Sequence, residues 1–129
     1  MKYDPLELAW AAGFFDGEGC FGAHLRERSL YPLISAQIGQ TDTRPLVRFQ
    51  RAVGFGKIYG PYQYKLPSGR NAKPQYSWQE CKFEYVQQLV CLLFYYLSEP
   101  KREQATRVLK KYHNLRAKAQ EVTECVQQR

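Results

Sequence analysis

The sequence lacks any apolar run that approaches the ~20 residues needed to span a bilayer, and its first residues do not place a basic segment before a hydrophobic one, as a secretion signal would. We therefore expect an intracellular protein, in a bacterial cytoplasm or an organelle. The chain also lacks internal repeats and long linkers. Because 44% of its 129 residues are hydrophobic, it can bury a core, which excludes disorder and favours one domain over residues 1–129.

Cysteine and histidine are scarce, and no two cysteines form a C-x-x-C pair. Their spacing gives little support for a structural zinc site. We expect reduced, mostly buried thiols. The six residues are Cys20, Cys81, Cys91, Cys125, His24 and His113.

Acidic residues are missing from the segment 43–79, where seven basic residues are interleaved with tyrosine and tryptophan. The whole chain has 19 Lys and Arg against 12 Asp and Glu, a formal net charge of +7. A solvated face normally mixes both signs, so the segment favours a polyanion, foremost nucleic acid. A generally basic surface, an anionic membrane and an acidic protein are the alternatives. The basic residues are Arg44, Arg48, Arg51, Lys57, Lys65, Arg70 and Lys73.

Hydrophobic periodicity predicts an α+β fold. Asp4 as N-cap, Pro5 at the first helical position and Glu7 in the capping-box position start the first helix. We expect Tyr62, Tyr64, Tyr76 and Trp78 to pack in the core or the second hairpin. The predicted elements are a helix over 5–15, strands over 20–26 and 33–40 joined by a polar turn near Ser29, a helix over 42–53, strands over 56–64 and 74–81, a helix over 83–97, and a last helix from Pro100 that frays within 116–129.

The first helix carries a stripe of small residues, because Ala9, Ala12, Gly13 and Asp16 fall at i, i+3, i+4 and i+7. This spacing predicts a dimer interface at which two copies of the helix approach closely. Asp16 and Glu18 would then meet at the dimer axis, at the unfavourable end of each helix dipole. Two such charges 4 Å apart repel by about 4 kcal/mol at an effective dielectric constant of 20, which implies divalent cations, with Mg²⁺ favoured by oxygen ligands.

Two alternative roles of these acids stay open. In the first, Asp16 caps local backbone amides while Glu18 is a solvated turn residue. A glycosidase-like acid pair is the other enzymatic interpretation, and the short basic chain disfavours it.

The nine residues from Ala11 to Gly19 resemble the signature of the LAGLIDADG homing endonucleases, with Glu18 in place of the commoner final aspartate. The predicted order α-ββ-α-ββ-α(α) is similar to that family's half-domain, so the resemblance covers about residues 5–115, with 116–129 as a tail. It implies an antiparallel sheet that binds DNA. Members with a single motif act as homodimers through the motif helices, which agrees with the small-residue stripe.

The resemblance also implies a set of catalytic residues. Glu18 matches the metal-binding acid, and the backbone carbonyl of Gly19 would be a second metal ligand. Gln40 and Lys101 would position or polarise water, and Arg44 would line the surroundings of the scissile phosphate. Without the family match, Gln40, Arg44 and Lys101 would be interpreted as ordinary strand-end or surface residues.

Alternation leaves one face of both predicted hairpins polar. A two-stranded ribbon fits the major groove, where Arg and Lys read guanine and Gln reads adenine. In the family this sheet contacts DNA. We expect the same role for His24, Arg26, Arg28, Tyr31, Leu33, Ser35, Gln37, Lys57, Tyr59, Lys73, Gln75 and Ser77.

The resemblance thus implies a homodimeric, site-specific endonuclease of the intron-homing type that hydrolyses double-stranded DNA at a long pseudo-palindromic target and leaves short 3′ overhangs. Mg²⁺ would be the cofactor and Mn²⁺ a substitute, whereas Ca²⁺ would bind without supporting cleavage. No membrane partner and no small-molecule substrate are expected. The alternatives are a non-cleaving relative, such as an intron RNA-splicing maturase, and an unrelated basic binding module with a chance motif match.

Overall fold

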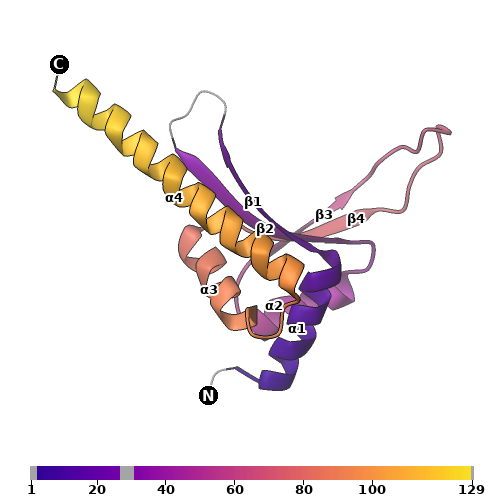
Figure 1. Ribbon diagram of the computed structural model, residues 1–129. Coiled ribbons are helices and arrows are strands. Elements are labelled where there is room, and N and C mark those ends of the chain that lie inside the picture. Colours follow the sequence, from indigo (N-terminus) through magenta and orange to yellow (C-terminus); the bar gives the residue numbers. More distant parts are fainter. Residues whose placement is uncertain (1–2, 27–30, 129) are drawn as a thin grey trace.

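The computed structural model describes residues 3–26 and 31–128, and it has the predicted α+β order (Figure 1). The predicted turn near Ser29 lies outside the described residues, as does Arg28. No helix in the described ranges is long and apolar enough to cross a membrane. The elements are α1 (Pro5–Glu18), β1 (Gly19–Leu25), β2 (Pro32–Gln40), α2 (Thr43–Val53), β3 (Lys57–Tyr62), β4 (Gln75–Glu80), α3 (Phe83–Leu93) and α4 (Glu99–Gln127).

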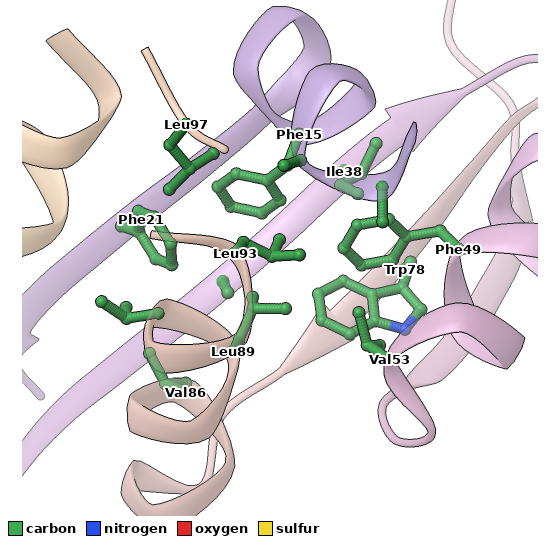
Figure 2. Close-up of a cluster of buried hydrophobic side chains, with 14 of the residues drawn as sticks. Phe15, Phe21, Ile38, Phe49, Val53, Trp78, Val86, Leu89, Leu93 and Leu97 are labelled. Carbon is green, nitrogen blue, oxygen red and sulfur yellow. The ribbon is translucent and has the colours of Figure 1, made fainter. Parts of the chain in front are cut away.

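The four strands form one antiparallel sheet in the order β1-β2-β4-β3. Alternate residues of its strands are buried, and the helices pack on that face. Ile38 is paired with both Gly19 of β1 and Trp78 of β4, which places the centre of β2 over the core. Figure 2 shows the core between the sheet and the helices. Its largest fully buried side chains are Trp78, Phe15, Phe49, Ile34, Ile38, Leu46, Leu89 and Leu93.

Helix ends follow the predicted capping residues, with one exception. Asp4 accepts from the Leu6 N–H at 2.9 Å, whereas Glu7 binds Arg48 instead of closing a capping box. Arg48 also lies over the Trp10 ring, 4.0 Å from its centroid, so it ties α2 to α1. Gly54 ends α2 in the left-handed region, at φ 88°, where glycine has no steric penalty.

Three expectations about helix ends and cysteines need correction. α1 continues through Gly17 to Glu18, because a glycine within a helix costs only about 1 kcal/mol relative to alanine and packing on the sheet supports the extra turn. α3 ends earlier than predicted, at Leu93. α4 extends to Gln127 (Figure 1), and the fraying expected near the end of this helix stays a prediction. The thiols are all free and exposed instead of buried: Cys20, Cys81, Cys91 and Cys125.

Candidate functional site

The junction of α1 and β1 brings the predicted metal ligands to one point. Glu18 is the last residue of α1 and is exposed, and Gly19 is the first residue of β1. A Cβ at Gly19 would lie 2.4 Å from the Phe15 ring, so only glycine lets the chain pass from helix to strand this close to the core. The absence of a side chain thus fixes where the Gly19 carbonyl lies.

That carbonyl accepts a hydrogen bond from Lys101 Nζ at 2.7 Å. Lys101 is in the first turn of α4, 82 residues away in sequence, and its ammonium lies 5.8 Å from the Phe15 ring centroid. The structure therefore places three of the predicted residues, Glu18, Gly19 and Lys101, at a single site.

Gln104 belongs to the same site and was missed by the sequence analysis. Its Oε1 accepts from the Phe21 backbone N–H at 3.1 Å and lies 3.4 Å from Lys101 Nζ. The available signal was its position three residues after Lys101, on the same helix face. Nothing in the sequence indicates that this face meets β1, because the contact depends on how α4 crosses the sheet.

Asp16 fixes the start of α4. Its Oδ1 accepts from both the backbone N–H (3.1 Å) and the hydroxyl (2.7 Å) of Ser98, the residue that precedes the helix. This bond supplies an acceptor for a backbone donor at the helix N-terminus and holds α4 against α1. The Asp16 carboxylate thus forms hydrogen bonds within its own protomer, and these bonds help to position Lys101 in the first turn of α4.

One of the four residues predicted for the dimer interface on α1 does not lie on the surface. Ala12 is fully buried in the protomer's own core and cannot contact another chain, because α1 turns this side toward the sheet and helices. The face that points outward instead contains Gly13 and Gly17, both exposed, and Leu6, which is 81% exposed. Ala9 is half-buried beside them.

Gln40 and Arg44 lie nearby with different surroundings. Because Gly19 pairs with Ile38, Gln40 lies two residues further along β2, at the same end of the sheet as Glu18, and is half-buried. Arg44 is bound to Asp42 by guanidinium contacts of 2.6–3.1 Å, and its side chain is 88% exposed. The hydrogen bonds from Arg44 lower the pKa of Asp42 to about 2. Arg44 is therefore turned toward Asp42 and has no contact with the Lys101 site.

The donor atoms at the α1–β1 junction fit a divalent cation only in part. Glu18 offers an exposed carboxylate, and the Gly19 carbonyl accepts a hydrogen bond from the Lys101 ammonium, so both groups are hard oxygen donors. Within the described part of one protomer, no group of three or more His, Cys, Asp or Glu could hold a metal ion.

The open face of the sheet presents the predicted contact residues in register. Cys20, Gln37, Gln79 and Lys57 are successive partners across all four strands, so they form one row. Gln79 was not predicted, although its alternation with Trp78 could have revealed it. The other rows are His24 with Leu33, Gly22 with Ser35, Gly39 with Ser77 and Tyr59, and Gln75 with Tyr62.

Several predicted contact residues lie away from these rows. Arg26 is exposed just after β1, and Tyr31 is 78% exposed just before β2. Lys73 precedes β4 and lines a depression with Asp42 and Thr43 at the start of α2. Of the tyrosines expected in the core or the second hairpin, Tyr62 and Tyr64 lie outside the core and are 40% and 56% exposed on the hairpin.

Comparison with solved structures shows which proteins share this fold. I-CvuI bound to its Sro1.3 target in the presence of Ca superposes with a TM-score of 0.63 and 28% identity, over 86% of this chain and 68% of that one. A second I-CvuI complex, with the I-CreI target uncleaved in the presence of Mg, gives a TM-score of 0.65 and 26% identity over 88% and 70%. The LAGLIDADG meganuclease I-CpaMI bound to uncleaved DNA gives 0.63 and 20% identity over 90% of this chain but 38% of its own.

The chain therefore has the fold of a LAGLIDADG homing-endonuclease half-domain, and the family resemblance predicted from the sequence is confirmed. No model of a protein family matches the sequence, and no curated protein matches it significantly.

Proposed function

We propose that the protein is a homodimeric, site-specific endonuclease that hydrolyses double-stranded DNA with the help of a divalent cation. The observation that carries this proposal is the hydrogen bond from the Lys101 ammonium to the carbonyl of Gly19, the residue that follows the exposed Glu18. The I-CvuI structures, which contain DNA targets with Ca or Mg, support the same assignment.

The residues at this site would divide the work of phosphodiester hydrolysis. A bound Mg²⁺ would neutralise charge on the phosphate and polarise water. Glu18 and the Gly19 carbonyl would hold it, and Lys101 would donate a hydrogen bond to the solvent or phosphate oxygens. Gln40, at the adjoining strand end, would orient water. Arg44 holds Asp42 with Nε and Nη2, so its Nη1 would be the nitrogen that serves the phosphate.

A second copy of the chain would complete the site. The described residues of one protomer contain no cluster of three His, Cys, Asp or Glu side chains for a cation, and the exposed glycine face of α1 allows the close approach of another α1. Two sites related by a two-fold axis would cut both strands of a pseudo-palindromic target. The enzyme would be of the intron-homing type, and its cuts would leave short 3′ overhangs.

The open sheet face would supply DNA recognition. Gln37 and Gln79 would read adenine, and Lys57 at the end of the same row would read guanine or bind phosphate, which their shared row across the sheet supports. A protein that neutralises about 6–10 phosphates should lose about 10³- to 10⁵-fold in DNA affinity when the salt concentration rises from 50 to 200 mM.

The test is incubation of the protein and Mg²⁺ with the DNA that flanks its own gene, joined without the intron. We expect a double-strand cut at one position, with Mn²⁺ able to replace Mg²⁺. With Ca²⁺ we expect binding but no cut. Failure to bind this DNA, together with a flat response to salt, would refute the nucleic-acid assignment, whereas salt-dependent binding without cleavage in Mg²⁺ or Mn²⁺ would refute only the nuclease assignment.

A further inference from the structure

The ammonium of Lys101 has two oxygen acceptors. One is the Gly19 carbonyl at 2.7 Å, and the other is Gln104 Oε1 at 3.4 Å. Gln104 cannot turn this oxygen elsewhere at no cost, because Oε1 also accepts from the Phe21 N–H at 3.1 Å. The amide is thus held by β1 while it faces Lys101 from α4.

The Gly19 carbonyl is also the oxygen assigned above to a divalent cation, so an ammonium and a cation compete for it. We propose that Gln104 is a positioning residue: it is the acceptor that takes the Lys101 ammonium when the Gly19 carbonyl binds a divalent cation. Lys101 then stays within the site instead of being expelled by repulsion between like charges. This inference rests on the proposed function, because it assumes the cation site.

Binding of Mn²⁺ to the purified protein without DNA, followed by electron paramagnetic resonance, tests this exchange. Lys101→Met should bind Mn²⁺ about tenfold more tightly, because the competing ammonium is gone. Gln104→Leu should bind Mn²⁺ about tenfold more weakly, because the Lys101 ammonium then has only the Gly19 carbonyl as an acceptor and competes with the cation for it. In the Lys101→Met background, Gln104→Leu should have no further effect.

Two more variants control for folding. Gln104→Glu keeps both acceptor positions and should bind at least as tightly as the wild type, while Gln120→Leu, exposed on the same helix, should bind as the wild type does. Equal weakening by Gln104→Leu with and without Lys101→Met would indicate a purely structural role and overturn the inference. So would the absence of Mn²⁺ binding in every variant. DNA cleavage by the wild type is measured separately, so the proposed function can stand if this inference fails.

A different observation concerns the outer surface of α4. Between Glu103 and Glu121 the helix carries five basic residues and no acid. All five are exposed, and none has a hydrogen-bond or ion-pair partner in residues 3–26 and 31–128. Four of them surround one depression of about 350 Å³. We call these four the α4 basic cluster: Arg107, Lys110, Lys111 and Lys118.

The α4 basic cluster lies on the opposite side of α4 from its core contacts. The helix packs on β1 and β2 through Ala105, Leu109 and Tyr112, so residues half a turn away face outward. A duplex on the open sheet face is separated from the cluster by the sheet and a helix about 10 Å thick. The charges span about 16 Å along the axis.

We infer that the α4 basic cluster binds a second segment of duplex DNA through its phosphates, without reading sequence. Unpaired Lys and Arg side chains complement a backbone that carries about one charge per 1.7 Å. Such a surface would hold two DNA segments on one protein and assist transfer between them.

A bridging experiment tests this. Beads that carry a random-sequence 30-bp duplex are loaded with protein, washed, and offered a second, fluorescent random duplex at 50 mM salt. Lys110→Gln combined with Lys118→Gln should reduce capture of the second duplex at least tenfold and leave binding to the beads unchanged. Lys82→Gln, which removes a charge elsewhere on the surface, should capture normally. Equal capture by the double variant and by Lys82→Gln, or capture of structured RNA but not of DNA, would overturn the inference.

Discussion

Ser98 donates two hydrogen bonds to Asp16 Oδ1, from its backbone N–H at 3.1 Å and from its hydroxyl at 2.7 Å. The residue that precedes α4 is therefore fastened to α1 one turn before the candidate site. Because Lys101 follows three residues later, the two motif acids have separate tasks: Asp16 orients α4, and Glu18 remains available to a cation.

Asp16→Ala removes the acceptor for Ser98. We expect a loss of about 1 kcal/mol in the free energy of unfolding, typical for a helix cap, together with slower cleavage because Lys101 is less well placed. Asp16→Asn keeps an oxygen at this position and should lose less of both. Urea unfolding and cleavage rates would measure the two effects, and equal losses in both variants would argue against the cap.

Glu18→Gln keeps the size of the side chain but removes the charge that recruits the cation. Cleavage should fall below detection while specific DNA binding survives, with affinity equal to or above that of the wild type because repulsion from phosphate is reduced. Glu103→Gln, an exposed acid on α4, is the matched control and should cut normally. A Glu18→Gln protein that cuts at the wild-type rate in Mg²⁺ would remove Glu18 from the active site.

Gly13→Leu tests the predicted dimer interface. Within one protomer a Cβ at Gly13 meets nothing within 4 Å, so the substitution should leave the fold of the monomer intact. If two α1 helices pack at this position, the leucine holds them apart, and both sedimentation as a dimer and cleavage should decrease. Gln87→Leu, exposed on α3, should stay dimeric. An unchanged dimer in Gly13→Leu would place the interface elsewhere.

Gly19→Ala should be more damaging than its small size suggests. The added methyl would lie 2.4 Å from the Phe15 ring, so either the ring or the start of β1 must move, and overpacking of this kind costs about 1–3 kcal/mol. Gly39→Ala, where the nearest atom is 3.8 Å away, is the matched control in a neighbouring strand. An equal change in the unfolding temperature of both variants would contradict the close contact between Gly19 and the Phe15 ring.

The Arg44–Asp42 pair predicts an acid-dependent loss of stability. Its hydrogen bonds lower the pKa of Asp42 from 3.8 to about 2, so the stabilisation is complete above pH 4 and disappears as the pH falls toward 2. Both groups are exposed, so the effect is small and should weaken with added salt. Unfolding of Asp42→Asn should depend less on pH between 4 and 2 than that of the wild type, and parallel curves would contradict the assignment.

Local patterns predicted most of the fold. Ile34, Ala36 and Ile38 alternate in β2 and are all buried, and Asp42 and Gly54 bracket α2 as expected. The predicted burial of Cys20 was wrong, and the same alternation explains why: its position in β1 places it on the open face, paired with Gln37.

The candidate site was less predictable because its contacts join distant segments. The Lys101–Gly19 bond spans 82 residues and the Gln104–Phe21 bond 83, and no local pattern specifies them. The interface role predicted for Ala12 was wrong for a similar reason. Spacing along α1 shows which residues share a stripe but not which side of the helix the rest of the protein covers.

The distal part of the β3–β4 hairpin has a consequence for how this protein can diversify. From Tyr59 to Gln75 every side chain except that of Ala72 is exposed, and Figure 1 shows this arm projecting away from the helices. Apart from Gly60 and Gly69, where φ is positive and a side chain would be strained, substitutions there remove almost no buried contact and should change the free energy of unfolding by less than about 0.5 kcal/mol each. The arm can therefore accumulate changes, or be exchanged with that of a relative, while the core stays the same, so that a new target preference can evolve without a compensating mutation elsewhere.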